Sequence, residues 1–366
     1  MSLSINRRRF MHGASAIAVG AMSYQSRRAA AQSPGELSVA LNGGDYAKAC
    51  IEAYVKPFEA ETGIKVTPVA EEVPAATLEL MVSTNSVSVD VIPVDAATTF
   101  KAPEKGLLEK IDYSIYKKDE LDGIVDFTRT PYSVGSIVYA LCMVYNTEKF
   151  PAGKPRPATW AEFWDVSKYP GVRAMSSGVD GAGPWEEALL ADGVPADALY
   201  PLDIDRVFAS LDKIKLHIRK WFVTGSENQQ LLHDKVVDLA QSYDGRAIAL
   251  MDQGAPIEAD RNQQKVTWES WGIPKGTKNL QNAQKFIEFI TRADRQAAFA
   301  KLIPYGPANR NAYKLLPDDV GRKFASHPDY LKSSIVVDSK WYATAGSDGV
   351  TNVERLIQRW NEWILQ

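Results

Sequence analysis

Short apolar stretches and helix-like stretches alternate along the first hundred residues of the chain. Residues 37–41 form an apolar run typical of a strand, and apolar residues then recur at four-residue steps, which predicts one face of a helix over 46–62. That face consists of Tyr46, Cys50, Tyr54 and Phe58. The pattern continues with a strand at 64–69, a helix at 75–83 and a strand at 87–94. This order predicts a mostly parallel sheet with helices on both faces.

A later apolar stretch, residues 136–146, is too long for one ordinary strand in one sheet, so we expect it to cross between two lobes. Residues 266–274 are a second candidate for such a crossing. A second α/β set lies between them, with predicted strands at 172–176 and 236–242 and predicted helices at 159–167, 184–192 and 203–221. Two amphipathic helices follow, at 280–291 and 350–365. This organisation predicts a hinged α/β protein that binds a ligand between its lobes.

The N-terminus contains the parts of an export signal in order. A paired arginine before Phe10 resembles the twin-arginine signal of bacteria. A weakly apolar stretch at 13–22 and the small-residue run 29–31 follow, whereas the alternative is an unstructured basic terminus. We expect residues 1–31 to be a signal peptide and the mature chain to begin near Gln32, outside the cytoplasm.

Charge narrows the classes of partner. The chain has 42 Lys and Arg against 45 Asp and Glu, and residues 1–31 hold five arginines and no acid. The mature chain therefore has 37 basic against 45 acidic residues, a net charge near −8. Nucleic acids and anionic lipids need clustered positive charge, so neither is predicted as a partner. A small cation suits an acidic chain better.

Cysteine and histidine usage predicts no cofactor and no metal. Cys50 and Cys142 are the only cysteines, and we favour two separately buried thiols over a disulfide. Beyond the signal, the three histidines each stand alone in the sequence: His217, His233 and His327. No Ser, His and acid motif stands out either, which leaves an exported hydrolase as a minor alternative.

Three turns could border a ligand site. In the turn at 42–45, helix amides could bind an anion, but Asp45 could occupy the same amides as an N-cap. The Gly-rich stretch 176–184 lacks the ending of a phosphate loop and is better explained as a flexible rim. Tyr243 ends a predicted strand, and ligand clefts of α/β proteins open at such carboxyl ends.

The stretch Trp268-Glu269-Ser270-Trp271 is the densest cluster of aromatic and acidic residues. An acid between two tryptophans is costly to bury unless a cation or a donor meets it. An ammonium ligand would satisfy the acid by charge and the rings by cation–π contact. The alternative is that both tryptophans are core residues.

Together these features resemble the periplasmic substrate-binding proteins of polyamine ABC transporters, the spermidine/putrescine group with the type II fold. The stretches that carry the resemblance are 58–66, 90–93, 106–112, 146–147, 157–165 and 168–171. The resemblance implies a two-lobed α/β fold with a hinged cleft, lobe 1 at 35–142 plus 272–314, and lobe 2 at 143–271 plus 315–366. It also implies a monomer in the periplasm that is not an enzyme and delivers a small molecule to an ABC permease in the inner membrane.

The resemblance also implies a set of ligand-binding positions. Asp45 and Tyr46 match the end of the family's first strand, although Gly43 replaces a tryptophan there. Glu269 matches the acid that clamps an ammonium group. The other positions that we include are Asp95, Tyr243, Trp268, Trp271, Tyr305 and Tyr342.

We therefore predict a receptor for a small cationic amine such as putrescine or spermidine. Alternatives within the same class are an anion, which the Gly-rich helix starts favour, an amino-acid-like ligand, and ferric iron, which the tyrosines favour.

Overall fold

The computed structural model describes residues 35–366. The predicted signal peptide at 1–31 lies outside the described residues. The described part of the chain has a two-lobed, mixed α/β fold, whose lobes we name by the two largest groups of core residues. The first lobe surrounds a core that includes Phe58, Trp271 and Phe286, and the second surrounds a core that includes Trp160, Trp185 and Trp360.

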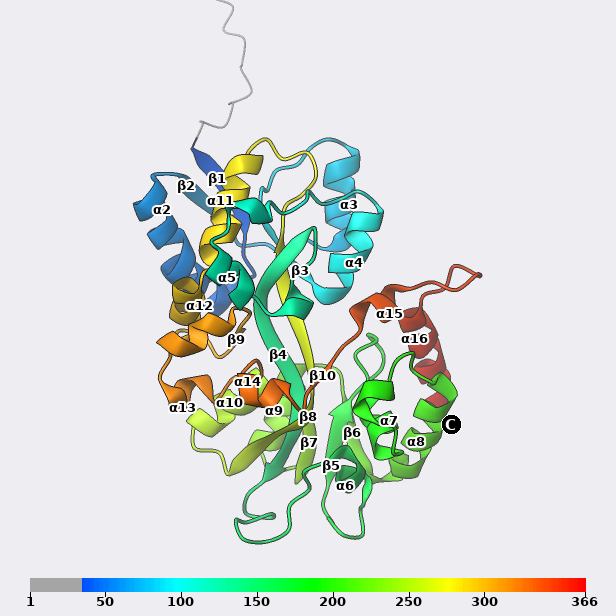
Figure 1. The fold of residues 1–366 in the computed structure, drawn as a ribbon. Helices are drawn as coiled ribbons and strands as arrows, with labels where there is room; N and C mark the ends of the chain where they lie inside the picture. Colours follow the sequence, from blue (N-terminus) through cyan, green and yellow to red (C-terminus); the bar gives the residue numbers. More distant parts are fainter. Residues whose placement is uncertain (1–34) are drawn as a thin grey trace, which may run out of the picture. The chain divides into compact units, whose positions relative to one another are not determined.

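The first lobe begins with the predicted alternation of strands and helices (Figure 1). Its elements are β1 (Glu36–Ala40), α1 (Gly44–Cys50), α2 (Lys56–Thr62), β2 (Lys65–Val69), α3 (Ala75–Ser83), β3 (Ile92–Asp95), α4 (Ala96–Glu104), α5 (Lys118–Gly123), α11 (Leu280–Ile290) and α12 (Ala293–Ala300). A π-helical segment, Ile51–Val55, joins α1 to α2 without a break, so the predicted helix over 46–62 is confirmed. The strands β1 and β2 pair in parallel, as predicted.

The second lobe contains three parallel strands and the helices around them. Its elements are α6 (Trp160–Trp164), β5 (Arg173–Ser176), α7 (Trp185–Ala191), α8 (Ile204–Ile214), β6 (Ile218–Phe222), α9 (Gly225–His233), β7 (Leu239–Tyr243), α10 (Asp244–Asp252), α15 (Ser339–Ala343) and α16 (Asn352–Trp363). Four short elements complete the chain: β9 (Gly306–Pro307), α13 (Asp318–Gly321), α14 (Pro328–Leu331) and β10 (Ile335–Val336).

Two long antiparallel strands, β4 (Ser133–Asn146) and β8 (Ile257–Gly272), belong to both lobes. They pair from Ser133 with Gly272 to Asn146 with Ile257, and Figure 1 shows them running together through the molecule. The larger sheet has the order β10-β8-β4-β7-β5-β6, while β3 pairs with the end of β8 and β9 with β4. Both predicted crossings are therefore confirmed. Because these strands contribute to both lobes, the predicted lobe boundaries stay predictions.

The helix predicted over 203–221 is wrong in its last part. Helix α8 ends at Ile214, a short 3₁₀ turn follows, and residues Ile218–Phe222 form strand β6 beside β5. The apolar residues Ile218 and Phe222 are four apart, so their spacing fits a helix as well as a strand. Pairing with β5 decides between the two, and pairing is not visible in the local pattern.

Cys50 and Cys142 are both buried and both free, which confirms separate thiols. Burial raises the pKa of each, that of Cys142 to about 12, so neither is a reactive thiolate near neutral pH. Within residues 35–366, no helix combines the length and the apolar character that crossing a membrane requires.

Candidate functional site

A cavity of about 380 Å³ lies where α4, the long strands and the second lobe meet. We call it the cleft cavity. Its lining comes from β3–α4, from β4 and β8, from the loop at 180–182, from the end of β7, and from α15. Nine residues with polar side chains line it: Asp95, Lys101, Tyr139, Asp180, Tyr243, Lys265, Thr267, Ser339 and Tyr342. Residues from both lobes therefore line one open cavity, as expected for a receptor that closes on its ligand.

A smaller hollow of about 240 Å³ adjoins the cleft cavity at Asp95. It is lined by Asn42, Glu72, Val73, Pro74, Pro93, Val94, Asp95 and Glu269. Strand pairing brings its two central acids together, because Asp95 on β3 is the antiparallel partner of Glu269 on β8. Side chains of partner residues project on the same side of a sheet, so both carboxylates face this hollow.

Glu269 has an unusual environment for a carboxylate. Its Oε2 atom is buried and has no hydrogen-bond partner in the described structure. Burial, and then the negative charges of Asp95 and Glu72, raise its pKa from 4.5 to about 7. Among the described residues, no basic side chain forms an ion pair with any of these three acids. We call Glu72, Asp95 and Glu269 the acidic cluster, and it is suited to a ligand that brings positive charge.

One of these acids already has a local structural role. The Asp95 carboxylate caps α4: Oδ1 accepts a hydrogen bond from the Thr98 amide at 2.7 Å, and Oδ2 accepts one from the Thr98 hydroxyl at 2.8 Å. It still lines both hollows. These two hydrogen bonds therefore hold the Asp95 carboxylate in one orientation, where the cleft cavity and the smaller hollow meet.

The residues of the predicted cluster at 268–271 do not all face the cavity, because successive side chains of β8 point to opposite faces of the sheet. Lys265, Thr267 and Glu269 share one face of the strand, with Lys265 and Thr267 in the cleft cavity and Glu269 in the hollow beside it. Trp268 points to the opposite face, where its ring lies 5.3 Å from that of Phe127. Trp271 is fully buried in the core of the first lobe. Neither tryptophan lines the hollows, so we no longer place them beside an ammonium group.

Asp45 is also away from the cavity. Its side chain is 87% exposed and pairs with Lys48 at 2.8 Å, one turn further along α1. It does not cap the helix, whose N-cap residue is Gly43. A cap or a ligand contact at Asp45 has no support in this geometry.

Tyr139 and Tyr243 provide an aromatic surface in the cleft cavity, while Tyr46, in the core of the first lobe, and Tyr305, packed against that core, lie near Glu269. The ring centroid of Tyr46 lies 6.3 Å from that of Tyr305, and the centroid of Tyr139 lies 6.3 Å from that of Tyr243. Burial raises the pKa values of Tyr46, Tyr139 and Tyr305, and the charge of Glu269 raises each further. All three rings therefore lie within electrostatic range of Glu269. Tyr139 was missed in the sequence, although it follows the alternation of β4.

Lys265 cannot serve as a partner for a ligand carboxylate. Its ammonium group donates to Gly183 O at 2.8 Å, to Glu187 Oε2 at 3.0 Å and to Glu186 Oε2 at 3.1 Å. A lysine has three N–H donors, so all are used. The remaining cation in the cleft cavity is Lys101, which has no ion pair among the described residues.

Arg246 is a second free cation and was not singled out in the sequence. It lies in the first turn of α10, three residues after Tyr243, and makes one side-chain hydrogen bond, to Gln229 at 3.2 Å. A Cβ atom at Gly225 would come within 3.2 Å of Tyr243 and 3.5 Å of Arg246, so both side chains lie against that glycine. The charge of Arg246 lowers the pKa of Tyr305, whereas burial and Glu269 raise it. Tyr305 therefore lies within electrostatic range of both the negative charge of Glu269 and the positive charge of Arg246.

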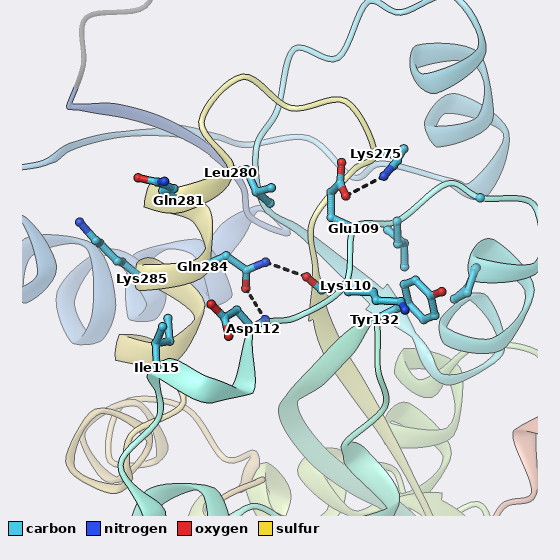
Figure 2. Close-up of a pocket in the computed structure, with 13 residues that line it drawn as sticks. Glu109, Lys110, Asp112, Ile115, Tyr132, Lys275, Leu280, Gln281, Gln284 and Lys285 are labelled. Carbon is cyan, nitrogen blue, oxygen red and sulfur yellow. Dashed lines mark hydrogen bonds and ion pairs between the residues drawn. The ribbon is translucent and has the colours of Figure 1, made fainter.

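A larger hollow of about 690 Å³ lies on the first lobe (Figure 2). Several of its polar groups are already paired: the Gln284 side chain donates to Lys110 O at 2.7 Å and accepts from the Asp112 amide at 2.9 Å. Glu109 and Lys275 form an ion pair at 2.9 Å. No buried side-chain polar atom in its described lining is left without a partner. The chemistry therefore favours the cleft cavity, despite its smaller volume.

The sequence matches the family described as bacterial extracellular solute-binding protein over residues 53–329, so the chain belongs to that family. It is 31% identical over 341 residues to the gamma-aminobutyric acid-binding protein of Pseudomonas aeruginosa, covering 92% of this chain and 93% of that protein. The spermidine/putrescine-binding periplasmic protein of Escherichia coli is more distant, at 24% identity over 308 residues, 80% of this chain and 85% of that protein.

Solved structures agree with this assignment. An ABC transporter substrate-binding protein from Bradyrhizobium japonicum superposes with a TM-score of 0.79 and 30% identity, covering 90% of this chain and 99% of that one. A GABA receptor superposes with a TM-score of 0.77 and 33% identity, covering 90% and 97%. The chain is thus a solute-binding receptor of an ABC importer, and its relatives are binding proteins rather than enzymes. These comparisons support the family of solute-binding proteins, but they do not support the predicted polyamine specificity within it, since the polyamine-binding relatives are more distant.

Proposed function

We propose that this protein is a periplasmic receptor that captures a small ω-amino acid of the γ-aminobutyrate type and delivers it to an ABC permease. The observation that carries the proposal is the acidic cluster. Its three carboxylates have no basic partner among the described residues, and the Oε2 atom of Glu269 is buried without any hydrogen bond. An ammonium group would supply the missing charge and the missing donors. The aromatic surface beside the cluster suits the methylene groups that follow.

Two free cations support a carboxylate at the other end of the solute. Lys101 lies in the cleft cavity. Arg246 lies close enough to Tyr305 for its positive charge to lower the pKa of that tyrosine, whereas burial and the charge of Glu269 raise it. A planar guanidinium can bind a carboxylate with two parallel hydrogen bonds, so we assign the carboxylate to Arg246. Two relatives, at 31% and 33% identity, are named for γ-aminobutyrate, which agrees with a zwitterionic solute.

A diamine such as putrescine is the second candidate. Asp180 lines the cleft cavity, where its negative charge raises the pKa of Tyr243 after burial, and it forms no ion pair among the described residues. A second ammonium group could pair with this carboxylate. The distant relatives that bind spermidine and putrescine agree with that alternative.

The test is a thermal-shift and calorimetry panel on the purified protein after bound solute has been removed. The panel contains γ-aminobutyrate, 5-aminovalerate, putrescine, spermidine, butyrate and n-butylamine. We expect the ω-amino acids to raise the melting temperature and putrescine to do so less, because binding to the folded state stabilises it by mass action. Butyrate lacks the ammonium group and should give no shift. A shift with putrescine and none with either ω-amino acid would overturn the zwitterion in favour of the diamine.

Arg246→Gln separates the two ends of the solute. It should weaken γ-aminobutyrate binding at least tenfold and leave n-butylamine binding unchanged, because only the former has a carboxylate. Arg219→Gln on β6, an exposed arginine without an ion pair in the described structure, is the matched control. Equal losses for both compounds would remove Arg246 from the role of carboxylate partner.

A further inference from the structure

A buried ionic cluster lies behind the wall of the cleft cavity in the second lobe. Glu186 and Glu187 are both 0% exposed in the first turn of α7, and they share the ammonium group of Lys265. The second oxygen of Glu187 accepts from the Gln241 side chain at 2.6 Å. Burying two carboxylates with one cation is costly unless every remaining acceptor is satisfied.

Tyrosine hydroxyls satisfy the other oxygen of Glu186. Oε1 accepts hydrogen bonds from Tyr200 and, at 2.6 Å, from Tyr342. Burial alone would raise the pKa of Glu186, but Lys265 and the two hydroxyls hold it below its ordinary value. The carboxylate is therefore charged, and a hydrogen bond to a charged acceptor is stronger than one between neutral groups.

Tyr342 connects this cluster to the first lobe. It lies on α15, a helix of five residues that contacts α4 of the first lobe. Ser339, Tyr342 and Ala343 of α15 line the cleft cavity together with Ala96, Ala97 and Lys101 of α4. Such a short helix has little stability of its own, so side-chain contacts must hold it in place. Helix α4 in turn begins at Asp95, next to Glu269.

We propose that Tyr342 is a positioning residue for solute capture. Its hydrogen bond to Glu186 holds α15 against α4, and so keeps α4 and the Asp95 carboxylate that caps it in place in the wall of the cleft cavity. This rests on the proposed function, since it assumes that the cleft cavity is the solute site. The hydroxyl acts on the solute through α15 and α4. Glu186 and Glu187, fixed by Lys265 in the second lobe, thus hold the helix α15 that contacts the first lobe through α4.

Hydrogen exchange without any solute tests the connection itself. In Tyr342→Phe, which keeps the ring, we expect the amides of α4 (residues 96–104) to exchange about tenfold faster, the change typical of losing one hydrogen bond to a charged group. The control is Tyr169→Phe, because the Tyr169 hydroxyl donates to Glu162 at 2.7 Å elsewhere in the second lobe. It should lower the urea midpoint similarly and leave exchange of α4 unchanged. Equal exchange of α4 in the two variants and the wild type would overturn the proposal, as would an equal rise in both.

Affinity gives the second readout. With γ-aminobutyrate as the probe, Tyr342→Phe should weaken binding about tenfold, and Tyr169→Phe should leave it unchanged. If γ-aminobutyrate does not bind the wild-type protein, the proposed solute is wrong, while faster exchange of α4 still supports the positioning role. If exchange rises and affinity does not change, α4 is held by Tyr342 but the cleft cavity is not the solute site, and the proposal fails.

Discussion

Replacing Glu269 by Gln tests directly whether this carboxyl is held at an energetic cost in the absence of solute. Glutamine keeps the shape of the side chain and removes its charge. In the folded protein, Glu269 has a pKa of about 7 because it is buried and close to Asp95 and Glu72. In the unfolded chain, where those causes are absent, we expect its ordinary value of 4.5.

The sign follows from which state holds the proton more tightly. Below pH 4.5 both states are protonated, and the carboxyl costs nothing. Between pH 4.5 and 7 the folded protein keeps a proton that the unfolded chain has lost, so the free energy of unfolding falls as pH rises. At about 1.4 kcal/mol for each tenfold change in proton affinity, the loss reaches about 3 kcal/mol by pH 8. Glu269→Gln should therefore be more stable than the wild type at pH 8, by up to about 3 kcal/mol, and equally stable at pH 4.5.

Urea unfolding at pH 4.5, 6 and 8, on solute-free protein, measures this difference. The matched control is Glu104→Gln, at the end of α4, where the carboxylate is exposed and has no ion pair in the described structure. It should change stability by less than about 0.5 kcal/mol at every pH. If Glu269→Gln gives no stabilisation at pH 8, or the same change at pH 4.5, the reasoning from a buried, unpaired carboxylate is refuted.

The remaining predictions concern the solute, the buried cluster and one helix cap. Affinity for γ-aminobutyrate should fall about a hundredfold from pH 8 to pH 5, because the solute must displace the proton of Glu269; calorimetry showing a constant Kd would contradict this. Lys265→Met should lower the free energy of unfolding by about 3–5 kcal/mol in urea at pH 7, because it leaves Glu186 and Glu187 buried without a cation; a loss below about 1 kcal/mol would mean that they are protonated. Thr351→Ala removes one half of the capping box of α16 and should cost about 1 kcal/mol by urea unfolding, whereas Thr351→Ser should be nearly neutral.

Much of the fold could be predicted because local pattern and tertiary structure agree. The helix over 46–62 and the two long strands were visible in apolar spacing and in length, and all three are present. Strand β6 was missed because apolar residues four apart satisfy both periods, and only the partner strand β5 distinguishes them. The polar first half of β8 was missed for a related reason: its strand character comes from pairing with β4.

The candidate site was predicted only in part. Glu269 and Tyr243 were identified by their place at an acid–aromatic cluster and at a strand end, and the structure places both beside the adjoining hollows. Arg246 and Glu72 were missed, since an exposed arginine and an exposed glutamate are common in any sequence. Trp268 was included because it is adjacent to Glu269, but adjacent residues of a strand point to opposite faces.

The sequence by itself determined the alternating strands and helices over residues 37–94, the existence of two strand segments shared by the lobes, and the presence of an acid where a cation would be needed. Those features depend on the spacing of residues along one segment. Tertiary structure alone decided that Glu269 lies beside Asp95, that Lys265 is fully occupied by Glu186 and Glu187, and that Arg246 remains free. The physical reason is that charge and burial act through space: a pKa and an available donor depend on groups that lie far apart in the chain and are brought together only when the chain folds.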